Sequence, residues 1–157
     1  MDKTNAMRLL DGAKIAYTVH EYEVDENDLS GESTARKLGI PPEQIFKTLV
    51  ISGEKHGFAV CCIPSNEELD LKKAAKLFGE KKMEMLHVKD LLKTTGYIRG
   101  GVSPIGMKKQ YATYIHESCL TFDKMAVSGG TCGVTLLLSP NDLIKVTKAK
   151  TCDIVKE

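Results

Sequence analysis

The 157-residue sequence lacks any long hydrophobic segment. No stretch approaches the roughly 18 uncharged apolar residues that a membrane-spanning helix requires. The residues after Met1 are Asp2, Lys3, Thr4 and Asn5, so the start of the chain has no apolar run typical of a signal peptide. Repeats and low-complexity segments are also missing. These absences predict a cytoplasmic protein that makes no contact with a membrane.

An excess of charge of one sign is missing as well. The 22 Lys and Arg residues nearly balance the 21 Asp and Glu residues, so the formal net charge of +1 does not indicate a strongly basic nucleic-acid-binding protein. Arginine is scarce, with Arg8, Arg36 and Arg99 alone; lysine, the main basic residue, binds phosphate as a point charge. The length and the 42% hydrophobic content predict one globular domain over residues 1–157.

The common motifs of metal, nucleotide and triad chemistry are absent. There is no GxxxxGK[ST] loop, no GxGxxG, no GxSxG and no HExxH, and the four histidines are scattered without ligand spacing. The five cysteines contain no CxxC pair. We therefore predict neither a metal nor a cofactor. We expect four reduced, buried cysteines, whereas Cys132 lies in a glycine-rich loop. The four are Cys61, Cys62, Cys119 and Cys152.

Hydrophobic periodicity predicts short helices and more numerous strands. The expected helices begin near Thr4, at Ser30 or Ser33, at Asp70, at Val88 and at Ser139. The expected strands cover 15–22, 46–52, 58–63, 83–86, 112–116, 134–138 and 144–147. The first of these strands alternates as if one face were buried, and the next two form a β-hairpin. The regular strand–helix rhythm of a doubly wound sheet is missing, so we expect an α+β fold with a mixed, strongly curved sheet flanked by short helices.

Three features are candidates for a site. The Gly100–Gly106 loop (GGVSPIG) allows close approach to a ligand, and exposed N–H groups there would bind a carbonyl oxygen; the alternative is a plain connector. The Ser128–Gly133 loop is either part of a site or a tight hairpin turn. Lys47, at the start of a strongly apolar strand, is either an edge-strand charge or a residue directed into a pocket.

Together these features resemble a known family over almost the whole chain. The resemblance is carried by short motifs in a specific order and spacing. The motifs are TNAMRLL at 4–10, HEY at 20–22, FKTLV at 46–50, LDLKKAA at 69–75, TGY at 95–97, GGVSPIG at 100–106 with Lys108 and Lys109, VSGG at 127–130 and LSPNDL at 138–143. The chain resembles the YbaK/EbsC family of aminoacyl-tRNA deacylases, free-standing relatives of the editing domain inserted in bacterial prolyl-tRNA synthetases.

The resemblance implies a mixed sheet curled into a barrel-like shape with surrounding helices. It also implies hydrolysis of misacylated tRNA, with the branch that acts on Cys-tRNA(Pro) the most similar and the branch that acts on Ala-tRNA(Pro) the alternative. The implied partners are aminoacyl-tRNA, namely tRNA(Pro), and prolyl-tRNA synthetase. A relative that binds aminoacyl-tRNA or a partner without catalysis is a further alternative.

The same resemblance implies roles for individual residues. Catalytic roles fall on Lys47, which would bind the 3′-terminal nucleotide or its phosphate, on Gly101, whose loop would polarise the ester carbonyl, and on Ser128. Substrate-binding roles fall on Tyr22, Thr48, Gly100, Val102, Ser103, Pro104 and Gly129. The nucleophile would be the thiol of the cysteinyl substrate, or a positioned water for an alanyl substrate. One departure from the family is Thr131-Cys132, where many relatives carry basic residues.

Overall fold

The computed structural model describes residues 2–157, which form two β-sheets and short helices. The helices are α1 (Asn5–Gly12), α2 (Gly31–Leu38), α3 (Leu71–Phe78), α4 (Leu91–Thr95) and α5 (Pro140–Thr147), with 3₁₀ turns η1 (Pro42–Gln44), η2 (Val88–Asp90) and η3 (Glu117–Thr121). The strands are β1 (Tyr17–Glu21), β2 (Phe46–Gly53), β3 (Gly57–Pro64), β4 (Met83–Met85), β5 (Ala112–His116), β6 (Met125–Ser128), β7 (Val134–Leu138) and β8 (Lys150–Cys152). No helix within residues 2–157 has the length and apolarity to cross a membrane.

Helices α1, α2 and α3 begin and end where the sequence predicts, because local capping groups determine their ends. The Thr4 hydroxyl accepts a hydrogen bond from the Met7 N–H (3.2 Å), and Ser30 caps α2 through the Ser33 N–H (3.1 Å). Asp70 caps α3 through the N–H groups of residues 72 and 73. Helices α2, α3 and α4 each end at a glycine with positive φ, which satisfies the last carbonyls of the helix.

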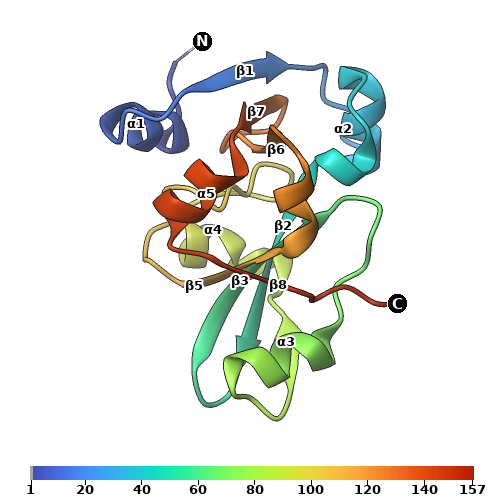
Figure 1. Ribbon diagram of the computed structural model, residues 1–157, viewed down its shortest axis with the longest axis vertical. Coiled ribbons are helices and arrows are strands. Elements are labelled where there is room, and N and C mark those ends of the chain that lie inside the picture. The colour runs from blue at the N-terminus through green and yellow to red at the C-terminus, as the bar shows by residue number, and fades with distance from the viewer. Residues whose placement is uncertain (1) are drawn as a thin grey trace.

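The strands form two sheets. One is antiparallel, in the order β1-β7-β6, and the other is mixed, in the order β4-β2-β3-β5-β8, with β3, β5 and β8 parallel to one another. A parallel bridge between Ile45 and Ala126 links β6 to the start of β2. Figure 1 shows α1 and α2 at opposite ends of β1, and the β2–β3 hairpin extending from the region of β6 and β7 toward α3. The main core lies between the two sheets, around Phe46, Met125 and Leu136.

The α+β class and the mixed pairing confirm the expected fold, with three corrections. The strands divide into two sheets, and neither sheet closes on itself. Residues 144–147 are not a strand, because Pro140 begins a helix that runs on to Thr147, and the strand follows at β8. Strand β1 has no fully buried face, because it is the edge of its sheet and Val19 is 41% exposed.

The cysteines are all free thiols within the described chain, and they follow the prediction at three of four positions. Cys61, Cys62 and Cys119 are buried, but Cys152 is half-buried because it lies on the edge strand β8. Burial raises the pKa of Cys62 to about 12 and that of Cys119 to about 11. These thiols are therefore protonated at neutral pH and act as small apolar core residues.

Candidate functional site

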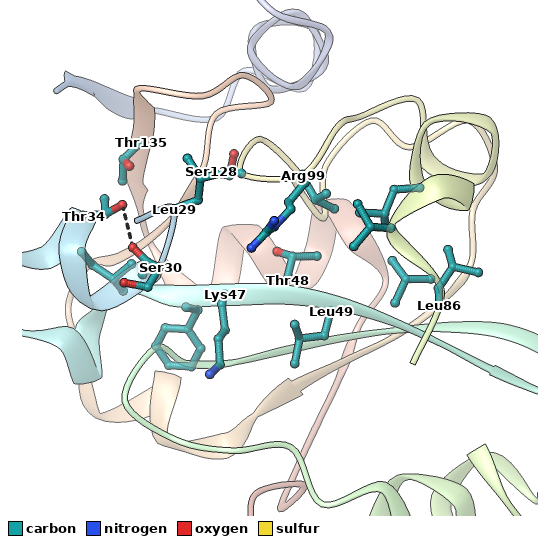
Figure 2. Close-up of a pocket in the computed structure, with 18 of the residues that line it drawn as sticks. Leu29, Ser30, Thr34, Lys47, Thr48, Leu49, Leu86, Arg99, Ser128 and Thr135 are labelled. Atoms are coloured by element: carbon teal, nitrogen blue, oxygen red, sulfur yellow. Dashed lines mark hydrogen bonds between the residues drawn. The ribbon is translucent and has the colours of Figure 1, made fainter. Parts of the chain in front are cut away.

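A pocket with a volume of about 320 Å³ opens where the first half of β2 faces the antiparallel sheet. It is bounded by Tyr22 and the segment from Leu29 to Thr34, by residues 45–50 of β2, by residues 85–91, and by the turn around Arg99. Ser128 of β6 and Thr135 of β7 complete it. Figure 2 shows these side chains converging from elements that are far apart in the sequence. A concave, mostly apolar site with a few polar groups is typical of small-molecule binding.

The lining of this pocket carries positive charge and no negative charge. Of its lining residues only Lys47 and Arg99 are ionised, and the Lys47 ammonium is directed to the other face of β2 (Figure 2); the lining includes no Asp, Glu, His or Cys. The remaining polar side chains are hydroxyls, on Tyr22, Ser30, Thr34, Thr48, Ser128 and Thr135. The site therefore favours an anionic group and offers hydroxyl oxygens to a donor, but it holds no His, Asp or Glu to act as a general base for these hydroxyls and no thiol nucleophile.

Lys47 and Thr48 are consecutive residues of β2 and point to opposite faces of the strand. Figure 2 shows the Lys47 side chain directed away from Thr48 and from Arg99. Lys47 is half-buried, and its ammonium group has no hydrogen-bond or ion-pair partner within residues 2–157. Thr48 points into the pocket, and its hydroxyl lies 3.8 Å from the Cys62 thiol. The sequence prediction that Lys47 and Thr48 adjoin a pocket agrees with this placement, while their roles stay predictions.

On the side of β2 away from β3, no strand within residues 2–157 pairs with Thr48. The Ile45 carbonyl accepts from the Ser65 N–H (2.8 Å) on the β3 side, and the Val50 carbonyl accepts from the Leu86 N–H (2.9 Å) on the opposite side. Because the direction of backbone groups alternates along an antiparallel strand, the N–H and C=O of Thr48 point to the same side as those of Val50. Strand β4 pairs with β2 from Ile51 onward, so the backbone of Thr48 is unpaired at the pocket.

The two glycines at 100 and 101 have a structural explanation. The Gly101 N–H donates to the Ile98 carbonyl (2.9 Å), and Gly100 has φ +85°, which together define a type II turn with glycine at its third position. A Cβ atom on Gly101 would lie 3.0 Å from backbone atoms of both Thr131 and Cys132, so the second glycine allows two loops to touch. The Gly101 N–H, which the sequence analysis assigned to the ester carbonyl, is thus already bonded, and Gly101 does not line the pocket.

Other residues expected at the site divide into two groups. Tyr22, Gly100, Val102 and Ser128 line the pocket together with Lys47 and Thr48. Ser103, Pro104 and Gly129 do not, since they support the loops instead. The buried Ser103 hydroxyl accepts from the Ile105 N–H (3.3 Å). The Gly129 N–H donates to the Val134 carbonyl (2.9 Å), while its own carbonyl accepts from the Thr4 hydroxyl (2.6 Å).

Arg99 is the charged residue that the sequence analysis missed. It precedes the glycine pair in the turn, its side chain is exposed, and Figure 2 shows its guanidinium reaching into the pocket on the same side of β2 as Thr48. The Cys132 thiol donates to the Arg99 carbonyl (3.4 Å), so the Thr131-Cys132 loop packs against the Arg99 turn. Two features of the sequence could have indicated Arg99, namely the scarcity of arginine in the chain and its position next to two glycines.

Comparison with known proteins identifies the class to which this fold and pocket belong. A family model described as "Aminoacyl-tRNA editing domain" matches residues 26–146, which is more than half of the chain. The chain belongs to this family of aminoacyl-tRNA editing domains, and the family resemblance predicted from its motifs is confirmed. At the level of the family, the protein is an aminoacyl-tRNA editing enzyme.

Individual relatives are consistent with this membership. The chain is 50% identical over 152 residues to the "Putative Cys-tRNA(Pro)/Cys-tRNA(Cys) deacylase EbsC" of Enterococcus faecalis, covering 97% of this chain and 93% of that protein. It is 30% identical over 78 residues to "Proline--tRNA ligase" of Thermosipho africanus, covering 50% of this chain and 14% of that protein. A solved structure described as "a putative trans-editing enzyme for prolyl tRNA synthetase" superposes with a TM-score of 0.82 at 25% identity, covering 100% of each chain.

Proposed function

We propose that this protein is a trans-editing deacylase that hydrolyses the ester bond of misacylated Cys-tRNA(Pro). The observation that carries the proposal is the acid-free, cation-bearing pocket of about 320 Å³ at the unpaired edge of β2. Its volume suits one small amino acid and part of the terminal nucleoside. The name of the half-identical Enterococcus relative supports the cysteinyl substrate. We further propose that the protein acts in the cytoplasm and that prolyl-tRNA synthetase contributes to the recognition of tRNA(Pro).

The unpaired backbone of Thr48 offers a place for the aminoacyl group. An amino acid esterified to tRNA carries an ammonium donor and a carbonyl acceptor at the spacing of one strand residue. In a hydrogen-bonded antiparallel pair, the two residues exchange both N–H···O bonds. The Thr48 C=O would accept from the substrate ammonium, and the Thr48 N–H would donate to the ester carbonyl, in place of the Gly101 N–H. One such donor is typically worth about 3–4 kcal/mol in the transition state.

The nucleophile in this proposal comes from the substrate, because the pocket lining has no His, Cys, Asp or Glu. The thiol sulfur of the cysteinyl group attacks its own ester carbonyl, a C–S bond forms, and the C–O bond to the ribose breaks. The thiol proton goes to the ribose oxygen, which leaves as a hydroxyl. Water then opens the resulting thiolactone to give free cysteine. The contribution of the protein is to hold the thiol and carbonyl in reactive geometry.

The test compares deacylation of Cys-tRNA(Pro) and Ala-tRNA(Pro) by the wild type, by Lys47→Ala and by the control Lys76→Ala, an exposed lysine of α3 outside the pocket. We expect fast loss of the cysteinyl ester, slower loss of the alanyl ester, and a reduction of at least tenfold in Lys47→Ala alone, the size of a lost charge-assisted contact.

The outcomes separate the alternatives. Equal rates on the two esters would overturn the substrate-thiol mechanism and favour a positioned water. Full activity of Lys47→Ala would remove Lys47 from the site. Binding of tRNA without hydrolysis of either ester would show a non-catalytic binding protein.

A further inference from the structure

The pocket contains a second cation whose position is set by the fold. Arg99 occupies the second position of the Ile98–Gly101 turn, the position before the glycine that has positive φ. The 131–132 loop holds this turn in place, because the Cys132 thiol donates a hydrogen bond to the Arg99 carbonyl and the Gly101 backbone contacts the loop. The backbone of Arg99 is therefore held while its side chain extends freely into the pocket.

The three arginines of the chain differ in what their guanidinium groups contact. The Arg36 guanidinium lies 3.3 Å from the Asp28 carboxylate, and the Arg8 guanidinium donates to the Lys3 carbonyl (2.6 Å). The Arg99 guanidinium has neither kind of partner within residues 2–157, and the pocket lining contains no carboxylate. A guanidinium group without a partner, in a pocket that lacks carboxylates, is suited to bind an anion that accepts two parallel N–H···O hydrogen bonds.

The chemistry of the substrate class then limits what this anion is, an argument that rests on the proposed function. In an aminoacyl-tRNA the amino acid is a cation and the ester is neutral, so the phosphodiesters are the anionic groups near the reacting bond. The proposed contacts of the amino acid are with the Thr48 backbone and the hydroxyl groups, which leaves the guanidinium for the phosphodiester. The phosphodiester would then lie at the open, solvent-exposed side where Arg99 enters.

We propose that Arg99 binds a phosphodiester of the 3′ end of the tRNA and thereby sets which end of the substrate enters the pocket. Arg99 is a binding and orienting residue in this proposal and takes no part in the chemical step. It acts separately from Lys47, whose ammonium points to the other face of β2.

The experiment measures deacylation of Cys-tRNA(Pro) and of the cysteinyl ester of adenosine, which lacks phosphate. The variants are Arg99→Ala, Arg99→Lys and the control Arg36→Ala, which removes the same charge from an exposed site on α2. We expect Arg99→Ala to raise KM for the tRNA substrate about 10- to 100-fold with little change in kcat, and to leave the adenosine ester unaffected. Arg99→Lys should recover part of the loss, because it keeps the charge without the fork. The salt dependence of log KM should become shallower by roughly 0.7, the value for one contact to a single strand.

Two results would overturn the proposal: equal losses on both substrates, which would mean that Arg99 supports the shape of the pocket, or no loss on either. Inactivity of the wild type on both esters would instead count against the proposed function. In that case the dissociation constant of a single-stranded RNA ending in CCA still decides the role of Arg99. Weaker binding by Arg99→Ala than by Arg36→Ala supports phosphate binding, and unchanged binding refutes it.

Discussion

At the scale of single residues, the adjacent glycines at 100 and 101 meet two different requirements. Gly100 adopts a φ of +85°, which is strained for residues other than glycine. Position 101 requires glycine for a different reason, because Thr131 and Cys132 leave no space for a Cβ atom. A pair that looked like a ligand-binding loop in the sequence is thus a turn fastened to a second loop. Gly100 lines the pocket, whereas Gly101 affects it indirectly, through the position of Arg99.

Substitution of Gly101 by alanine is expected to destabilise the protein by about 1–3 kcal/mol, because the new Cβ lies 3.0 Å from backbone atoms that have little freedom to move. Gly12→Ala is the matched control, since it lies in α1 with nothing within 4 Å of a Cβ and should be neutral or stabilising. Urea unfolding of both variants measures the difference. Equal midpoints for Gly101→Ala and the wild type would contradict the close approach of the two loops.

Part of the site is predictable from the sequence at this scale. Lys47 was a candidate because it lies at the start of an apolar strand, and Thr48 because the family resemblance includes the FKTLV motif at 46–50; the structure places both at the pocket. The sequence does not reveal that Gly101 lies outside the pocket lining, because a glycine pair has the same appearance in a ligand loop and in a turn. Arg99 was missed because no local pattern tells whether an arginine finds a carboxylate partner in the folded chain.

At the scale of secondary-structure elements, the C-terminal segment is held to α3 by Lys73. Its ammonium group lies 3.0 Å from the Asp153 carboxylate and donates to the Val155 carbonyl (2.8 Å). The hydrogen bond from Lys73 lowers the pKa of the Asp153 carboxyl below its ordinary value. The unfolded chain therefore binds the proton more readily, and the stabilisation is present above about pH 4 and lost as the pH falls through the lowered pKa.

We accordingly expect Asp153→Asn to destabilise the protein near neutral pH and to make its stability less dependent on pH between about 2 and 5 than that of the wild type. The control is Asp123→Asn, an exposed carboxylate without an ion-pair partner within residues 2–157. Thermal unfolding across this pH range provides the measurement. If the stability of Asp153→Asn decreased as steeply as that of the wild type when the pH is lowered, the contact would not persist in solution.

The elements themselves were predictable to the extent that local chemistry determines them. The caps at Thr4, Ser30 and Asp70 act within three residues, so their positions are readable from the chain. The division into two sheets depends on which distant strands pair, such as β1 with β7, and no local signal encodes this. The alternating segment at 144–147 (IKVT) is too short for periodicity to distinguish a strand from a helix, and the helix that begins at Pro140 includes it.

At the scale of the whole molecule, the N-terminal segment fastens both glycine-rich loops. The Asn5 side chain donates to the Gly106 carbonyl (2.7 Å), and the Thr4 hydroxyl donates to the Gly129 carbonyl. These contacts join positions 101 and 125 residues apart in the sequence. The first helix thus holds the two loops that enclose the upper part of the pocket, although it contributes no lining residue.

We expect Asn5→Ala to loosen the Gly100–Gly106 loop while leaving α3 and the β2–β3 hairpin unchanged. The lost hydrogen bond is worth about 1 kcal/mol, which corresponds to roughly fivefold faster amide exchange where that loop opens locally. Hydrogen exchange read by mass spectrometry measures this, with Asn141→Ala on α5 as a control that has no such contact. If amide exchange became faster to the same extent over the whole chain, the substitution would destabilise the protein generally and Asn5 would not hold this loop in particular.

The unpaired edge of β2 has one more consequence, which concerns self-association. A β-branched, apolar strand with free backbone groups is a template on which another copy of the chain can add a strand, and proteins ordinarily guard such edges with charge. Lys47 supplies such a charge in the part of β2 that lacks a strand partner on this side, between Phe46 and Thr48. The unpaired edge that would bind a substrate would thus also pair with a strand of a second copy of the chain. Repulsion between the Lys47 charges of the two copies opposes this pairing and so favours solubility.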